Sequence, residues 1–154
     1  MTENNPFARL PEVPAFALTS ENLIDLSLSQ LSGISGVPGG REASPQLSWS
    51  GAPETTKSYT VTVYDPDAPT GSGFWHWAVA NIPADTTTIP EGAGDDGSGL
   101  PGSAVQIPND ARAARFIGDV GVAADSTPAT VGFLMAGHAI ARAWIMGTAE
   151  NPAA

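Results

Sequence analysis

The chain has no cysteine among its 154 residues. This excludes a disulfide framework, thiolate metal ligands and a thiol nucleophile, and it agrees with a reducing cytoplasm. Basic residues are also scarce: six against 16 acidic ones, which gives a formal net charge of −10. Such a charge repels phosphate backbones and anionic lipid surfaces, so we expect no nucleic-acid binding and no basic membrane-binding patch.

Long apolar runs are missing as well. No segment approaches the length of a membrane-spanning helix, so no membrane insertion is expected. Residues 1–10 lack the basic start and apolar centre of a secretory signal. We therefore expect a soluble, cytoplasmic protein. The length suits a single domain over residues 1–154, and the hydrophobic content of 42% supports one core.

What the chain does contain is abundant glycine and proline, 17 and 14 residues, which favours short strands and turns over long helices. The clearest predicted strand covers residues 58–64, where Tyr59, Val61 and Val63 alternate with threonines. Residues 74–82 carry apolar side chains on both faces, which predicts a central strand. Shorter strands are predicted at residues 16–20 and 104–107 and at the end of residues 43–49.

The C-terminal part changes to a helical period. Ser126 or Thr127 can cap a helix, with Pro128 at its first position and Gly147 at its end. Helical spacing then relates Val131, Leu134, Met135, His138, Ala141, Arg142 and Ile145. Gly132 and Gly137 would each weaken this helix by about 1 kcal/mol relative to alanine. The fold class predicted from the sequence is mainly β with a C-terminal α-helix.

An acidic, proline-rich stretch follows the first long strand directly: Asp65, Pro66, Asp67, Ala68 and Pro69. The two prolines fix φ and remove backbone donors, so the two carboxylates stand on a rigid loop. Such a loop at a strand end can orient a ligand group or a water. The commoner use of a stretch like this is an ordinary turn, in which aspartate side chains cap local amides.

His76 stands between Trp75 and Trp77 in the predicted central strand. An imidazole can donate to phosphate or change its charge near neutral pH, whereas a buried histidine satisfied by the backbone is the plainer alternative. Together with Asp65 and Asp67, it outlines a small-anion or polar-headgroup site with an aromatic wall. For His138 we expect a packing or capping role. No metal motif, dinucleotide fingerprint or nucleophile elbow is present, so we predict no metal and no cofactor.

Four segments occur in a fixed order, namely Ala-Ser-Pro-Gln-Leu-Ser-Trp-Ser-Gly at 43–51, Tyr-Asp-Pro-Asp-Ala-Pro at 64–69, Phe-Trp-His-Trp at 74–77 and Asn-Ile-Pro at 81–83. In this combination the chain resembles the phosphatidylethanolamine-binding protein family, in its bacterial Raf-kinase-inhibitor-like branch. The resemblance covers residues 7–118 and resumes at 128–148.

The resemblance implies a β-sandwich-like fold around a large antiparallel sheet, with a C-terminal helix. It implies a non-enzymatic protein that takes phosphate-like headgroups, and it leaves room for regulation of a partner protein. By matching position, the implied ligand-binding residues are Asp65, Pro66, Asp67, Pro69 and His76, and the supporting wall is Pro45, Trp49 and Trp75.

The chain departs from the family pattern after residue 118. Family members continue with a Pro-rich loop and a His-Arg-Tyr strand, whereas here residues 119–127 lead almost directly to Pro128. The missing donors predict weak binding of phosphate-like anions. The missing strand predicts an open edge beside residues 58–64, and hence self-association such as a homodimer, or lowered stability. Rearrangement of residues 115–124 into the vacant position is the alternative.

Two other classes of function stay open. Asp65 or Asp67 with His76 could serve as the acid–base pair of a hydrolase, although no nucleophile or oxyanion donor is evident. The chain could also be a remnant fold that has lost ligand binding.

Overall fold

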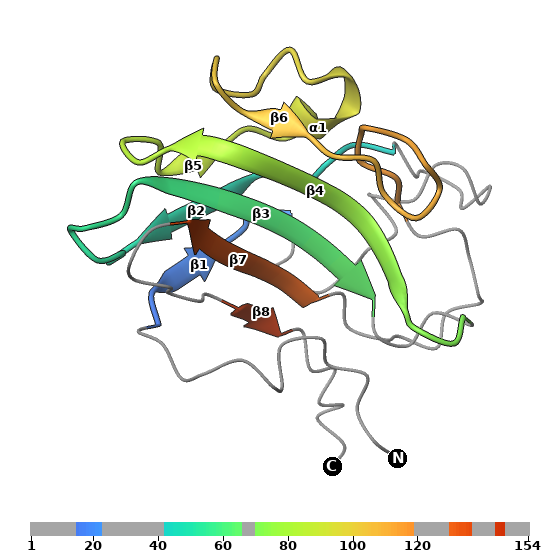
Figure 1. Ribbon diagram of the computed structural model, residues 1–154, viewed down its shortest axis with the longest axis horizontal. Helices are drawn as coiled ribbons and strands as arrows, with labels where there is room; N and C mark the ends of the chain where they lie inside the picture. Colours follow the sequence, from blue (N-terminus) through green and yellow to red (C-terminus); the bar gives the residue numbers. More distant parts are fainter. Residues whose placement is uncertain (1–14, 23–41, 66–69, 119–129, 137–143, 147–154) are drawn as a thin grey trace.

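The computed structural model describes residues 15–22, 42–65, 70–118, 130–136 and 144–146 (Figure 1). These residues form a three-stranded antiparallel sheet of order β1-β2-β5 and a five-stranded antiparallel sheet of order β6-β4-β3-β7-β8, with one short helix. The elements are β1 Ala17–Thr19, β2 Leu47–Ser50, β3 Ser58–Asp65, β4 Phe74–Pro83, β5 Thr88–Ile89, α1 Ala93–Asp96, β6 Val105–Gln106, β7 Thr130–Ala136 and β8 Trp144–Met146. The prediction of a mainly β fold built on a large antiparallel sheet is confirmed.

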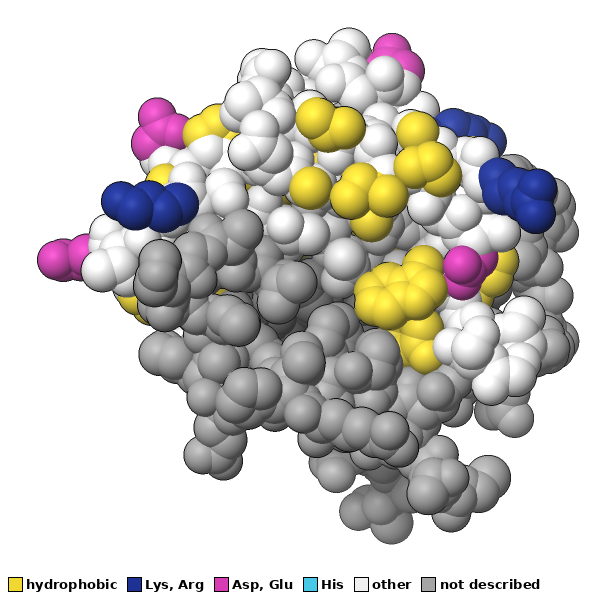
Figure 2. Space-filling view, in the orientation of Figure 1, with side chains coloured by type: hydrophobic (Ala, Val, Ile, Leu, Met, Phe, Trp, Pro, Cys, Tyr) yellow, Lys and Arg dark blue, Asp and Glu magenta, His cyan; other side chains and the backbone are white. Residues whose placement is uncertain are grey.

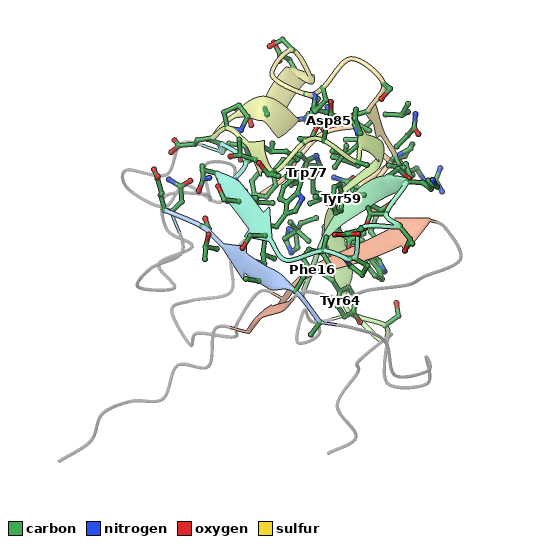
Figure 3. The ribbon with its side chains drawn as sticks, turned by 90° about the vertical axis from the view of Figure 1, so that its left-hand side faces the viewer. Phe16, Tyr59, Tyr64, Trp77 and Asp85 are labelled. Carbon is green, nitrogen blue, oxygen red and sulfur yellow. The ribbon has the colours of Figure 1, made fainter. Side chains whose placement is uncertain are left out.

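The core lies between the two sheets. Tyr59 of β3 packs its ring against Trp49 of β2 at a centroid distance of 5.2 Å and against Phe16 at 6.2 Å. Figure 3 shows Phe16, Tyr59 and Trp77 in the space between the sheets. Burial of such large side chains stabilises the fold by about 1.5–3 kcal/mol each. The side chains buried in this core are Leu18, Leu47, Trp49, Tyr59, Val61, Val63, Trp77, Val79, Ile82, Ile89 and Ala93, with Phe16 and Phe116.

The long central strands follow the predicted pattern. On β3, Tyr59, Val61 and Val63 are at most 5% exposed, while the threonines between them are partly exposed. On β4, hydrogen-bonded neighbours on both sides, β3 and β6, confirm the predicted central position. Figure 2 shows apolar side chains over β4 and β6 on the described part of that face, with charged side chains at the margin. In the described segments, no helix is both long and apolar enough to cross a membrane.

The predicted open edge of β3 is wrong, because β7 lies along it. Seven residue pairs join the two strands, from Ser58 opposite Ala136 to Tyr64 opposite Thr130. The chain therefore supplies the strand next to β3 from its own C-terminal segment. Residues 115–118 run beside β4 instead, and residues 119–124 lie outside the described residues.

The predicted C-terminal helix is also wrong over the described residues, which form β7 and β8. The same residues satisfy two periods: Val131, Phe133 and Met135 alternate as a strand requires. Gly132 disfavours a helix, and the ladder along β3 satisfies the backbone donors and acceptors of the strand. The capping residues 126–128, His138 and Gly147 lie outside the described residues.

Two irregularities in β4 decide where its side chains point. Near its C-terminal end, Tyr59 pairs with Ile82. The next residue pair is Val61 with Val79, so β4 holds one residue more than β3 in this interval. Asn81 lies there with φ of 60°, in the left-handed region that asparagine tolerates better than most residues.

The second irregularity involves His76. Val63 pairs with Trp77 and Tyr64 pairs with Trp75, which leaves His76 without an opposite residue on β3. Successive side chains of a regular strand point to opposite faces, but here His76 and Trp77 are both buried, at 6% and 0% exposed. A bulge at this position re-aims the histidine, and bulges often lie beside functional sites.

Candidate functional site

The structure places His76 close to the end of the strand pair that precedes the acidic loop. Asp65 is the last residue of β3, and its backbone pairs with Phe74 of β4. The ring of Phe74 lies edge-on to the ring of His76 at a centroid distance of 4.8 Å. The register therefore places the backbone of Asp65 opposite Phe74, two positions before His76, and the convergence of the Asp65 side chain with His76 stays a prediction. Pro66, Asp67 and Pro69 lie outside the described residues, so their convergence with His76 stays a prediction.

His76 is held by a backbone carbonyl. Its Nδ1 lies 2.9 Å from the Ile117 oxygen. A carbonyl only accepts, so Nδ1 carries the hydrogen and donates it. In the neutral ring, Nε2 is then an unprotonated acceptor; in the protonated ring, Nε2 becomes a second donor. Nε2 is therefore the ring nitrogen that this hydrogen bond does not engage.

The buried side chain of Asn109 connects His76 to the loop beside it through hydrogen bonds to backbone groups. Its Nδ2 donates to the carbonyls of His76 and Arg115, both at 3.0 Å. Its Oδ1 accepts from the amides of Ala111 at 3.0 Å and Ala113 at 3.1 Å. All four hydrogen-bonding positions of the amide are thus used. Sequence reasoning missed this residue; the signal that could have found it is an asparagine followed by aspartate, a pair typical of turns that bond their own backbone.

Three successive backbone amides of residues 116–118 donate hydrogen bonds to other parts of the chain. Phe116 donates to the Gly94 carbonyl at 2.8 Å, and Ile117 donates to the His76 carbonyl at 3.1 Å. Gly118 donates to Oε1 of Glu42 at 3.1 Å. Each bond reaches a different part of the chain, so the segment is fixed between α1, β4 and the residues before β2. Glu42 is a second residue that sequence reasoning missed.

Trp75, predicted in the supporting wall, adjoins the site through its backbone and ring. Its amide donates to Oδ2 of Asp110 at 2.9 Å, and the Asp110 amide donates to its carbonyl at 3.2 Å. Its ring packs on Tyr64 at 4.5 Å, and the Tyr64 hydroxyl donates to the Ser72 carbonyl at 2.7 Å. These contacts fix the strand ends on both sides of the acidic loop.

Pro45 lies in a buried segment next to α1. It is fully buried, and the preceding Ser44 accepts at Oγ from the Gly94 amide at 2.8 Å. A Cβ on Gly94 would lie 2.5 Å from the Trp77 ring, so only glycine fits there. Because Gly94 also accepts from Phe116, the Pro45 segment is linked through α1 to the loop that holds His76.

Trp49, the other predicted wall residue, lies in the core between the sheets. It is 4% exposed and packs on Tyr59, whose partner Ile82 is at the far end of β4 from Phe74. Its position supports the sandwich as a whole.

Two carboxylates hold backbone amides of the segments next to His76: Glu42 accepts from the Gly118 amide and Asp110 accepts from the Trp75 amide. No group of three potential metal-ligating side chains occurs within the described segments. The hydrogen-bonding partners of His76 there are backbone groups and the Asn109 amide.

Known proteins resemble this chain in sequence and in fold. A family model described as phosphatidylethanolamine-binding protein matches residues 14–121. UPF0098 protein YbcL of Escherichia coli is 51% identical over 111 residues, which are 70% of this chain and 60% of YbcL. UPF0098 protein YbhB of the same organism is 51% identical over 71 residues, 46% of this chain and 45% of YbhB. The matches thus span less than two thirds of these relatives.

Two solved structures share the fold. The crystal structure of E. coli YbcL, described as a new member of the mammalian PEBP family, matches with a TM-score of 0.66 and 46% identity, over 78% of this chain and 74% of that one. A putative PEBP homologue, CT736 of Chlamydia trachomatis, matches with a TM-score of 0.59 and 26% identity, over 89% and 98%.

Proposed function

Because this chain belongs to the phosphatidylethanolamine-binding protein family, we propose that it is a non-enzymatic protein that binds a small phosphorylated headgroup beside His76. The observation that carries the proposal is the fixed orientation of the His76 ring, whose Nδ1 is committed to the Ile117 carbonyl. The ligand then meets Nε2, which donates to an anion once the ring is protonated.

The acidic loop complements the other end of such a ligand. Asp65 and Asp67 repel a bare phosphate but attract an ammonium group, and Pro66 and Pro69 restrict the loop that carries them. A zwitterion such as phosphoethanolamine satisfies both charges. Since the chain has a net charge of −10 and lacks the family's His-Arg-Tyr stretch, the proposed affinity is weak. A dissociation constant of about 1 mM, worth about −4.1 kcal/mol, is the expected order.

A binding role is favoured over hydrolysis by the partners of His76. A general base is normally within hydrogen-bond reach of a nucleophile or is oriented by a carboxylate. Here the described partners are the Ile117 backbone and the Asn109 amide. These contacts support a ring held to receive a ligand.

A cytoplasmic location and a protein partner are further parts of the proposal. The absence of cysteine supports a reducing compartment, and the acidic charge favours a partner with a basic surface. Size-exclusion chromatography with multi-angle light scattering on the purified chain, alone and with a candidate partner, tests the protein partner and also tests a homodimer.

Calorimetric titration tests the binding role. Phosphoethanolamine, inorganic phosphate and ethanolamine are titrated separately into the wild-type chain and into the His76→Gln variant. The proposal expects weak, saturable heat with phosphoethanolamine, less with either half of the molecule, and a loss of about tenfold in affinity in the variant. Absence of saturable binding by all three compounds, in a chain that unfolds cooperatively, would identify a remnant fold instead.

A further inference from the structure

We propose that Glu42 is a positioning residue for His76 and acts on it through the peptide group between Ile117 and Gly118. The N–H of this group donates to Oε1 of Glu42 at 3.1 Å. The C=O of the same group accepts from Nδ1 of His76 at 2.9 Å. One peptide plane thus has a carboxylate at its donor end and an imidazole at its acceptor end.

This arrangement has an electrostatic consequence. A carboxylate at the N–H end polarises the peptide group, and a polarised carbonyl is a stronger acceptor, because hydrogen bonds in a chain strengthen one another. The stronger acceptor favours the ring form in which Nδ1 carries the hydrogen. Glu42 therefore helps to fix the tautomer of His76 and, with it, the state of Nε2.

The backbone at Glu42 supports a specific role for this residue. Its φ is 52°, a left-handed value that few residues other than glycine, asparagine and aspartate adopt. Such conformations persist where the surrounding structure requires them, and they are frequent at functional sites. Three described residues other than glycine, Glu42, Asn81 and Arg112, have such a backbone, and the carboxylate of Glu42 holds the Gly118 amide.

The other charged residues in the neighbouring segments have contacts that do not involve the peptide group between Ile117 and Gly118. The Asp110 carboxylate accepts from the Trp75 amide at 2.9 Å. Arg115 is linked to the site through its carbonyl, which accepts from Asn109. Asp65 lies at the end of β3, across from Phe74. Among the described charged residues, Glu42 is the one that shares a peptide group with His76.

The consequence for binding rests on the proposed function. With Nδ1–H fixed, the neutral ring presents a lone pair at Nε2, which repels an anion, and only the protonated ring donates there. Anion binding should therefore be coupled to uptake of a proton by the ring. If the ring is not held in the Nδ1–H tautomer, the neutral ring can also carry the hydrogen on Nε2 and donate it to the anion. The affinity for the anion then depends less steeply on pH.

The test uses nitrogen-15 NMR of the histidine rings, without ligand, at a pH where the rings are neutral. The sequence has two histidines, so a His138→Gln background leaves the His76 signals alone. The proposal expects the Nδ1–H tautomer in this background. Glu42→Gln, which keeps an acceptor but loses the charge, should lower the ratio of Nδ1–H to Nε2–H by about threefold. Glu42→Ala, which loses both, should lower it by about tenfold.

The matched control is Glu91→Gln, which removes the same charge from a carboxylate that accepts from Asn22 at 2.6 Å. It should leave the ratio unchanged. An Nε2–H tautomer in the wild-type ring, or equal ratios in Glu42→Gln and Glu91→Gln, would overturn the proposal. The wild-type measurement holds even where a variant fails to fold.

A second arm separates this proposal from the proposed function. The probe is 2-aminoethyl hydrogen sulfate, whose sulfate does not titrate between about pH 5 and 8. Its affinity should fall with rising pH in the wild type and fall less steeply in Glu42→Ala. A shift of the tautomer ratio in the Glu42 variants, without any binding of the probe, supports the role of Glu42 and contradicts the binding function. Binding of the probe with an unchanged tautomer ratio in these variants supports the binding function and contradicts the role of Glu42.

Discussion

The side-chain amide of Asn109 donates a hydrogen bond of 3.0 Å to the backbone carbonyl of His76. The same carbonyl accepts from the Ile117 amide, so the residue at the bulge of β4 is held twice through its backbone and once through its ring. The loop that does this, residues 107–118, contains no regular secondary structure, and Asn109 is its one buried polar side chain. The folded conformation of this loop should depend strongly on the side-chain amide of Asn109.

Replacement of Asn109 by glycine should therefore lower the free energy of unfolding by about 2–4 kcal/mol. The change removes four hydrogen bonds and leaves buried carbonyls and amides to be satisfied by water. The matched control is Asn81→Gly, which removes an exposed amide bond to the Ser103 carbonyl and keeps the left-handed backbone. Urea unfolding should show a loss within about 1 kcal/mol for the control. Equal losses in the two variants would contradict the central role given to Asn109.

Gly94 should tolerate no side chain. A Cβ there would lie 2.5 Å from two atoms of the Trp77 ring and 2.9 Å from the Cβ of Ser44. Gly94→Ala should cost about 1–3 kcal/mol through overpacking, and it should change the tryptophan fluorescence of the folded chain. Gly71→Ala and Gly102→Ala are controls, because a Cβ at either position meets nothing within 4 Å. A Gly94→Ala variant as stable as these controls would show that α1 does not pack on Trp77 as described.

β7 should keep the chain monomeric by covering the edge of β3. Backbone N–H groups of successive strand residues point to opposite sides, so proline at position 134 or 135 removes a donor to β3 in one of the two cases. That variant should expose the edge and associate, as light scattering after size-exclusion chromatography would detect. A wild-type chain that already forms dimers, together with variants that change nothing, would show that the edge is closed in another way.

Ser98 should control the ionisation of Asp96. Its side chain, followed by its backbone amide at 2.9 Å from Oδ1, lowers the pKa of this carboxyl group below its ordinary value. A lowered folded-state pKa stabilises the fold above the unfolded-state value, and the stabilisation disappears as pH falls through the folded-state pKa. Ser98→Ala should raise the pKa toward the ordinary value, as carbon-13 NMR of the carboxyl group can measure. Since Asp96 is fully exposed, solvent screening should keep the change in stability small.

The sequence predicted β3 because its apolar residues alternate with threonines, and β4 because apolar side chains occupy both of its faces. It placed Asp65 next to the end of the first strand and His76 within the second. It did not predict the bulge at His76, because one extra residue leaves the local composition of a strand unchanged. The C-terminal segment was predicted wrongly because Val131, Leu134 and Met135 fit both a helix and a strand, and pairing with β3 decides between them.

The residues that hold His76 were beyond sequence reasoning for a different reason. Glu42 and Gly118 are far apart in the chain, and Asn109 lies in a segment without any hydrophobic period. Their contacts arise only when the loop folds back on β4. Periodicity reports which face of an element is buried, whereas these contacts depend on the path of a loop.

The measurement that tests the central claim most directly is an NMR titration of the His76 ring with phosphoethanolamine, in the His138→Gln background. The binding account predicts a saturable shift of the Nε2 signal, a dissociation constant of about 1 mM, and a smaller shift with inorganic phosphate alone. In the His76→Gln variant, the Ile117 and Gly118 amides should respond only at ligand concentrations about tenfold higher. A ring whose signals stay fixed through the titration, in a cooperatively folded chain, would contradict the claim that this site binds a phosphorylated headgroup.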